Sequence, residues 1–159
     1  MNSPHPSPSS GDGRMRRVGF TLIELVIVIG IMAVIVAVTA PLTIRSYQNQ
    51  LVAETAQQLA ETLRRAQSRA TAARGDSPHG VKILSDGYVL FQGRSYATRV
   101  VAEDETTPIP SSITVSSTAT EVVFSKLYAT SSMVGTMSVI GAGGTIDVTV
   151  NAVGKIEAP

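Results

Sequence analysis

FTLIELVIVIGIMAVIVAVTA, residues 20–40, is the stretch that decides the fold of this 159-residue chain. Its 21 residues carry one ionisable side chain, that of Glu24. A helix of this length extends about 30 Å, which is the thickness of the hydrocarbon core of a bilayer. The stretch, closed by Pro41, therefore predicts a membrane-spanning helix over residues 20–41.

The charges on either side of this stretch predict its orientation. Arg14, Arg16 and Arg17 precede it, and the next cation is Arg45. Because positive residues remain on the cytoplasmic side, we expect a single pass through the inner (cytoplasmic) membrane, with the N-terminus in the cytoplasm and the C-terminal part outside. A cleaved secretory signal peptide is the alternative. Its apolar region is typically about 7 to 15 residues long, shorter than the run here, and Pro41 would directly follow the cut.

Glu24 is the strongest candidate for a functional residue, because it is the one charge in the apolar stretch. A charge at the centre of a membrane helix costs about 2.5 to 3.5 kcal/mol on insertion scales. This cost is offset when an opposite charge meets the carboxylate among packed helices. The alternative is that Glu24 lies near the membrane surface, where it stays hydrated or protonated.

A second helical pattern follows Pro41 directly. Proline removes a backbone donor and would kink the helix or open it locally, but the next residues that signal a helix end are Gly75 and Pro78. We therefore expect an amphipathic continuation over residues 42–74, with an apolar stripe that needs a surface to cover it. The stripe consists of side chains three or four positions apart: Tyr47, Leu51, Thr55, Leu59, Leu63, Ala66, Ala70 and Ala73.

Residues 75–159 have the pattern of short strands separated by turns. GVKIL and YVLFQG flank Ser85-Asp86-Gly87, which is typical of a β-hairpin, and SITVS, EVVF and GTIDVTVN are further strand-like runs. The expected fold class is α+β, with a long N-terminal membrane-spanning helix packed on an antiparallel β-sheet domain. The core candidates in this domain are Val115, Val123, Ile146, Val148 and Ile156.

The composition and the motifs predict no catalytic residue, no cofactor and no metal site. The chain has no Cys, and its two histidines are far apart in the sequence. We expect His79, beside Pro78, to be a solvated turn residue, and residues 103–105 to form a solvated acidic loop rather than a cation site. Residues 1–19 carry a local charge of +2, and the remainder, at about −1, is near neutral, which argues against nucleic acid as a partner.

The basic N-terminal segment, Gly19, the run FTLIEL, the apolar helix with Pro41 and the C-terminal β-domain together resemble a type IV pilin-like precursor, a prepilin. The resemblance implies that a prepilin peptidase cuts between Gly19 and Phe20 and that the new amine of Phe20 is methylated. Glu24 would be the acid that pairs with this amine in a neighbouring subunit. Pro41 would mark the place where the helix loosens during assembly.

On this basis the chain divides into a leader (residues 1–19), a transmembrane and assembly helix (20–41), its amphipathic continuation (42–74) and a β-rich globular domain (75–159). The leader is long for the family, so Met15 is an alternative start. The expected partners are the prepilin peptidase, other pilin or pseudopilin subunits, an inner-membrane assembly platform and the lipid bilayer.

The rest of the chain is similar, more loosely, to the H-type minor pseudopilins of type II secretion and to related minor pilins. The similar stretches are LAETLRRAQSRATAARG, EVVF and GTIDVTVNAVGKI. This similarity implies a structural, non-enzymatic subunit of a type II secretion pseudopilus or a type IV pilus. One alternative is a minor pilin that binds DNA for uptake, although the closing GKIEAP lacks the arginine-rich tail of such proteins. The other is a single-pass anchor for an unrelated β-domain.

Overall fold

The computed structural model describes residues 19–158, and within them the side chains of residues 39–43 lie outside the description. The expected leader, with Met15 and the three arginines, therefore lies almost entirely outside the described residues. The chain divides into two compact units, Met1–Thr39 and Ala40–Pro159. One helix, α1 (Leu22–Thr71), contributes residues to both units and continues through position 41.

In the first unit, α1 exposes apolar side chains all round its circumference. Among the large apolar residues from Phe20 to Val38, the least exposed, Val28, still has 46% of its surface accessible. By length and apolarity, no helix in the described part of the chain qualifies as a membrane span.

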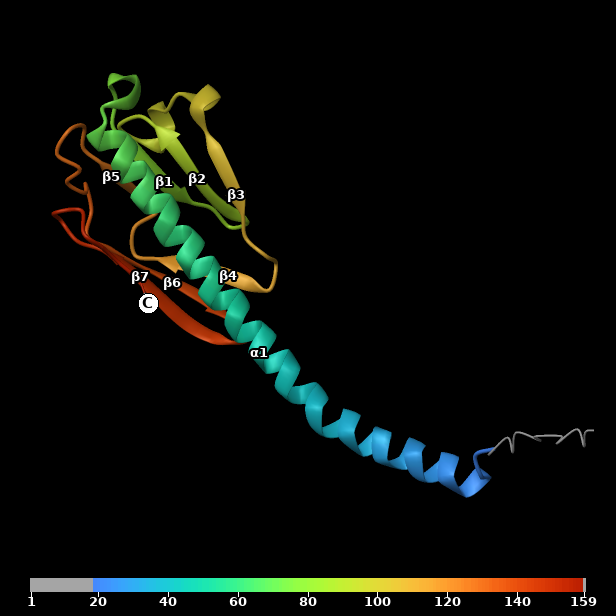
Figure 1. The fold of residues 1–159 in the computed structure, drawn as a ribbon. Helices are drawn as coiled ribbons and strands as arrows, with labels where there is room; N and C mark the ends of the chain where they lie inside the picture. Colours follow the sequence, from blue (N-terminus) through green and yellow to red (C-terminus); the bar gives the residue numbers. More distant parts are fainter. Residues whose placement is uncertain (1–18, 159) are drawn as a thin grey trace, which may run out of the picture. The chain divides into compact units, whose positions relative to one another are not determined.

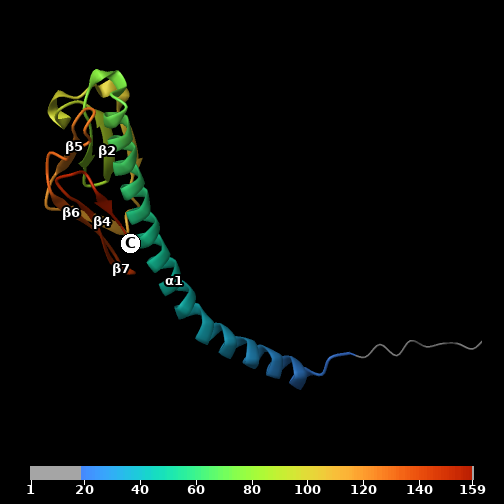
Figure 2. The ribbon, with the colours of Figure 1, turned by 60° about the vertical axis from the view of Figure 1, so that its left-hand side comes forward.

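The second unit is an α+β domain in which the C-terminal part of α1 lies across one side of two antiparallel sheets (Figures 1 and 2). The first sheet has the strand order β3-β2-β1-β5, and the second has the order β4-β6-β7-β8. The predicted combination of a long helix with antiparallel sheets is confirmed. The strands are β1 (His79–Ile83), β2 (Gly87–Gln92), β3 (Glu105–Pro108), β4 (Ile113–Ser117), β5 (Glu121–Phe124), β6 (Gly135–Gly141), β7 (Gly144–Val150) and β8 (Ile156–Glu157). Three short 3₁₀ turns are η1 (Arg74–Asp76), η2 (Tyr96–Thr98) and η3 (Val101–Glu103).

The buried face of α1 is broader than the predicted stripe. Five members of the stripe are buried: Thr55, Leu59, Leu63, Ala66 and Ala70. Tyr47 is instead 63% exposed, and Val52, Ala56 and Ala60, which the pattern left out, are buried. Because both sheets pack against the helix, side chains on either flank of the stripe are covered as well.

The core candidates in the sheets occupy two environments. Val148 is buried in the core, and Val115, Ile146 and Ile156 are partly buried and pack against it. Val123 is also buried, but its strand neighbours on both sides belong to the core, so its side chain points to the opposite face of the first sheet.

The helix ends earlier than the sequence predicts. α1 ends at Thr71, not Arg74, because Ala73 already adopts a left-handed conformation with φ of 49°. The backbone N–H of Ala73 donates to the carbonyl of Ala70 (3.0 Å), which closes the last turn. The next element is η1, which contains Gly75.

The turn between β6 and β7 packs directly on the backbone of α1. A Cβ added at Gly143 would lie 2.5 Å from the carbonyl carbon of Gln48, and one at Gly141 would lie 2.8 Å from Cγ2 of Val52. Glycine permits this close approach because it has no side chain. The second sheet is therefore held against the helix at the first turns of the amphipathic part.

Candidate processing and assembly site

Gly19, Phe20 and Glu24 lie in one short segment that opens the described part of the chain. Gly19 and Phe20 precede the helix, and Phe20 is 82% exposed. Apart from its chain neighbours, no heavy atom of the described residues lies within 4 Å of the position that a Cβ on Gly19 would occupy. The peptide bond between Gly19 and Phe20 is therefore open to an external protein.

Thr21 caps the helix, a role that the sequence analysis missed. Its Oγ1 accepts a hydrogen bond from the backbone N–H of Glu24 (3.3 Å), and its carbonyl accepts one from Leu25 (3.2 Å). The signal was present as Thr-x-x-Glu, the capping-box pattern at the start of a helix. As a result α1 begins at Leu22, and Phe20 stays outside it.

Glu24 lies in the first turn of α1, where a negative charge interacts favourably with the helix dipole. Its neighbours Leu22, Ile23 and Leu25 are exposed apolar residues. None of the ion pairs formed among residues 19–158 involves Glu24. Its carboxylate is thus available to a charge from outside the described chain.

Pro41 is the fourth predicted site residue, and its side chain lies outside the description. The helix assignment continues through this position.

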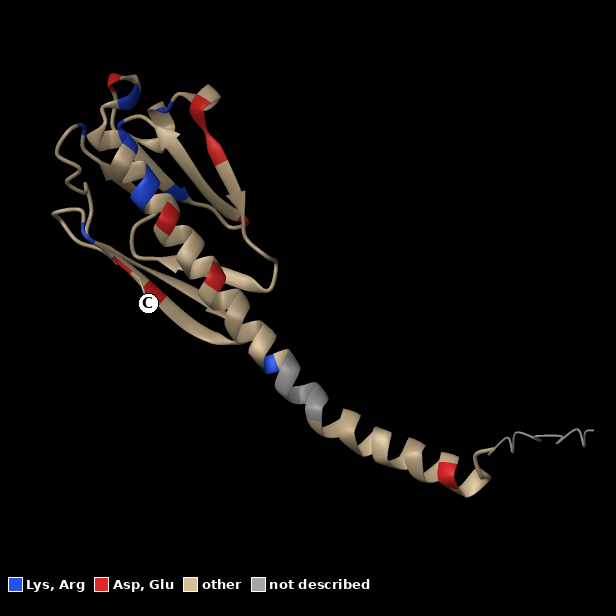
Figure 3. Ribbon diagram, in the orientation of Figure 1, with Lys and Arg blue, Asp and Glu red and all other residues tan. Residues whose placement is uncertain are grey.

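The acids at residues 103–105 are partly exposed, as predicted, but each of them also forms an ion pair, which the sequence did not predict. Glu105 forms ion pairs with Arg65 (3.1 Å) and with Arg69, both on the last turns of α1, where basic residues gather (Figure 3). The hydrogen bond from Arg69 lowers the pKa of Glu105 below its ordinary value. The neighbouring acids form the pairs Glu103–Arg74 (3.9 Å) and Asp104–Arg99 (2.7 Å). The two ion pairs of Glu105 therefore join α1 to β3, the edge strand of the first sheet.

His79 is not the solvated turn residue that the sequence suggested. It is the first residue of β1, which has β2 on one side and β5 on the other, and only 2% of its surface is exposed. Burial lowers the pKa of its imidazole, and Arg69 and Arg74 act in the same direction. Its Nδ1 is buried with no hydrogen-bond partner in the described part of the chain. We therefore assign His79 a packing role.

Comparison with known proteins supports the reading of the N-terminal segment. The family model described as the prokaryotic N-terminal methylation motif matches residues 14–40, a range that holds Gly19, Phe20 and Glu24. Proteins with curated descriptions give no significant match to this sequence.

The fold is similar to that of the minor pseudopilin EpsH from the type 2 secretion system of Vibrio cholerae. The match has a TM-score of 0.50 and 13% sequence identity, and it covers 65% of this chain and 92% of that one. At this identity the likeness is one of fold. The motif and the fold together confirm the prediction that the chain is type IV pilin-like.

Proposed function

We propose that this chain is a structural subunit, a minor pseudopilin or minor pilin, that assembles through its N-terminal helix into a type II secretion pseudopilus or a type IV pilus. The observation that carries the proposal is the methylation motif at residues 14–40, which continues into a helix with apolar side chains exposed on all sides. The likeness of the fold to a minor pseudopilin supports it.

In this proposal a prepilin peptidase hydrolyses the bond between Gly19 and Phe20, and the released amine of Phe20 is methylated. Two features support the assignment of this junction. The bond lies before the first helical residue, Leu22, so it is not held in the hydrogen-bond ladder of α1. Gly19 adds no side chain, and the space around it is open.

Before assembly, residues 20–41 would anchor the subunit in the inner membrane, with the N-terminus in the cytoplasm and the β-domain outside. The apolar side chains of α1 need a cover that the described chain does not supply, and lipid would provide it. During assembly on an inner-membrane platform, helices of neighbouring pilin-like subunits would replace the lipid.

Glu24 would pair with the N-terminal amine of Phe20 in a neighbouring subunit. The carboxylate lies one helical turn from the new N-terminus, among exposed apolar side chains that would be buried in a filament. A buried pair of opposite charges is tolerated, whereas removal of one partner costs about 3 to 5 kcal/mol. The pair would therefore make incorporation depend on correct processing.

The proposal is tested by exchanging Glu24 in the full-length protein. We expect Glu24→Ala and Glu24→Gln to be inserted into the membrane and processed after Gly19, but to be depleted from filaments, because the neighbouring amine loses its counter-charge. Glu54→Gln is the matched control, since Glu54 is an exposed acid on the amphipathic part of α1. The measurement is the amount of mature protein in sheared filaments relative to the membrane pool.

Intact-mass analysis of the same membrane pool reports whether residues 1–19 are absent and whether a methyl group is present. Wild-type incorporation of both Glu24 variants would contradict the charge pair. Retention of residues 1–19 in the wild-type protein would contradict the proposed function as a whole and favour a simple membrane anchor.

A further inference from the structure

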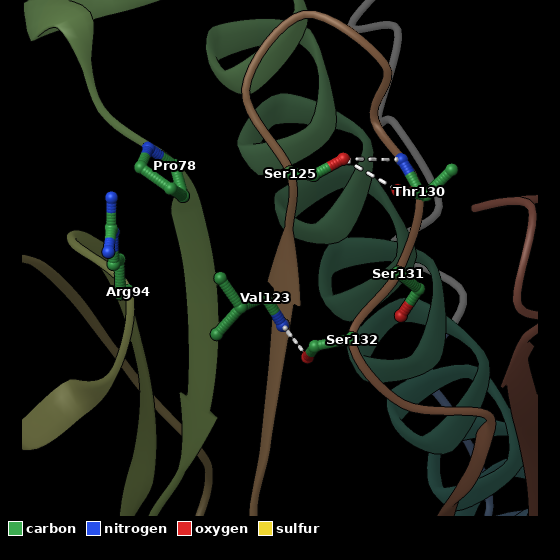
Figure 4. Close-up of a pocket in the computed structure, with 7 residues that line it drawn as sticks. All are labelled: Pro78, Arg94, Val123, Ser125, Thr130, Ser131 and Ser132. Carbon is green, nitrogen blue, oxygen red and sulfur yellow. Dashed lines mark hydrogen bonds between the residues drawn. The ribbon is translucent and has the colours of Figure 1, made fainter.

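A cleft of about 290 Å³ lies in the β-domain, and all of its lining residues come from positions 78–132. Figure 4 shows Arg94 and Pro78 on one side of it, the segment from Ser125 to Ser132 on the other, and the side chain of Val123 between them. The volume lies just below the range of about 300 to 1,000 Å³ for small-molecule sites. It suits one side chain or a small acid.

The backbone just before Arg94 is fixed by a hydrogen bond, which places Arg94 at the cleft. β2 ends at Gln92, and the N–H of Gly93 donates to the carbonyl of Pro78 (2.9 Å), which fixes the chain beside the start of β1. Gly93 has φ of 148° and lies so close to Arg99 that a Cβ would be 3.0 Å from its Cα. Arg94 makes no ion pair within the described residues, so its guanidinium retains its donors.

The opposite wall presents hydroxyl groups whose oxygens already accept hydrogen bonds. Oγ of Ser132 accepts from the N–H of Val123 (3.1 Å), which leaves its proton to donate. Ser125 Oγ accepts from the N–H of Thr130 (3.1 Å) and shares a second bond with Thr130 Oγ1 (2.6 Å). The bond between the two hydroxyls uses the proton of either Ser125 or Thr130. The proton of the other hydroxyl remains available to donate to a ligand.

The segment that carries these hydroxyls is fixed in place. The N–H of Ser132 donates to the carbonyl of Val123 (2.7 Å), and Ser131 forms a β-bridge with Phe124. Ala129 adopts a left-handed conformation with φ of 53°, and its N–H donates to the carbonyl of Ser125 (3.0 Å). The donors are therefore ordered before any ligand binds, which reduces the entropy cost of binding.

The lining has a surplus of donors and no acid. Its charged group is Arg94, its apolar lining consists of Pro78 and Val123, and its hydroxyls come from Ser125 and Thr130–Ser132. Of these hydroxyls, that of Ser131 already donates its proton to the carbonyl of Met133 (2.6 Å). A carboxylate accepts hydrogen bonds only and forms its strongest contacts with guanidinium groups. An aliphatic group attached to it would contact Val123 and Pro78.

We infer that this cleft binds an aliphatic carboxylate, from either the acidic side chain of a peptide or a free small acid. The carboxylate lies between the Arg94 guanidinium and the free hydroxyl protons, and its alkyl part rests on Val123. None of the residues that line this site belongs to the N-terminal segment.

The test is a titration of the full-length protein in detergent micelles, followed by the NMR amide shifts of Val123, Ser132 and Arg94. The probes are the peptides acetyl-Ala-Glu-Ala-amide and acetyl-Ala-Gln-Ala-amide, and isovalerate. We expect saturable shifts with the Glu peptide and binding of the Gln peptide at least about tenfold weaker. Isovalerate binding as tightly as the Glu peptide identifies a free acid as the ligand, and weaker binding identifies a peptide segment.

Arg94→Gln should reduce the affinity for the Glu peptide by about tenfold or more, because the charged hydrogen bonds are lost. The matched control is Arg64→Gln, since Arg64 is an exposed arginine on α1 that forms no ion pair within residues 19–158. Ser132→Ala should weaken binding by a smaller factor. Equal affinity for the two peptides, an unchanged response in Arg94→Gln, or the absence of a saturable shift overturns the inference.

Discussion

The two halves of α1 have the same backbone conformation but opposite relations to the rest of the chain. From Leu22 to Val38 the large apolar side chains are exposed on every side, whereas from Val52 to Ala70 a broad face is fully buried against two sheets. Hydrophobicity alone therefore does not decide which half belongs to the folded domain. The second half, with fewer large apolar residues, contributes to the domain core, whereas the described chain leaves the apolar side chains of the first half exposed.

The first half should be the part that other proteins act on. Gly19→Leu should abolish maturation, because the peptidase needs a small residue and backbone access before the cut, and the leader would remain attached. The unfolding of the β-domain should be unchanged. Intact mass and urea unfolding measure the two effects, and Gly30→Leu, at another open glycine of the same half, is the control. Maturation of Gly19→Leu at the wild-type rate would show that the junction lies elsewhere.

The second half should determine the stability of the domain. Leu63 is fully buried, so Leu63→Ala should lower the free energy of unfolding by about 2 to 5 kcal/mol. Ile27 is 55% exposed, so Ile27→Ala should change it by no more than about 0.5 kcal/mol. Urea titration of the full chain in detergent, followed by the near-UV signal of its tyrosines, compares them. A similar loss in both variants would mean that the first half also packs in the domain.

Pro41 lies between the two halves of α1. Replacing it tests whether the helix loosens at this position during assembly. Pro41→Ala restores a backbone donor and should stiffen the helix there. We expect membrane insertion to be unchanged and incorporation into filaments to change, by a smaller factor than in Glu24→Ala. Membrane fractionation and the filament-to-membrane ratio measure this, with Pro110→Ala, in the connection between β3 and β4, as the control. Unchanged incorporation would reduce Pro41 to a tolerated helix residue.

The smallest predicted effect is on the pH dependence of the unfolding free energy, and it concerns His79, the buried first residue of β1. Because burial lowers the pKa of His79, the folded state disfavours its protonated form, while the unfolded chain takes up a proton below about pH 6.5. The contribution of neutral His79 to the free energy of unfolding is therefore complete above that pH. It is lost as the pH falls toward the lowered pKa of the folded state. The charged groups around it are Arg69, Arg74 and Glu103.

His79→Gln should flatten the dependence of unfolding free energy on pH below about pH 6.5, whatever its effect on absolute stability. Urea titrations at several pH values measure the slope. An unchanged slope would assign the pH dependence in this range to other groups.

Local patterns in the sequence predicted the parts of the structure that depend on local interactions. The spacing from Thr55 to Ala70 and the Asp86-Gly87 hairpin are each contained in a short segment, and the fold agrees with them. GFTLIEL is equally local, and it lies within the range that the methylation-motif model matches. The ion pairs of Glu105 were missed because Arg65 and Arg69 are 40 and 36 positions away. His79 was misassigned for the same reason, since its burial follows from strands that pair with β1 on both sides.

The contact between Gly143 and the backbone of Gln48 has a mechanical consequence. A force pulling on the domain through α1 meets the β6–β7 turn at the first turns of the amphipathic part, before it reaches the residues that pack on the first sheet. The load enters the β-domain through the second sheet, where β6 pairs with β7 from Gly135 to Gly141. That hairpin is long for this domain, and its backbone hydrogen bonds share the load. A subunit pulled by its helix would thus be held first by the second sheet.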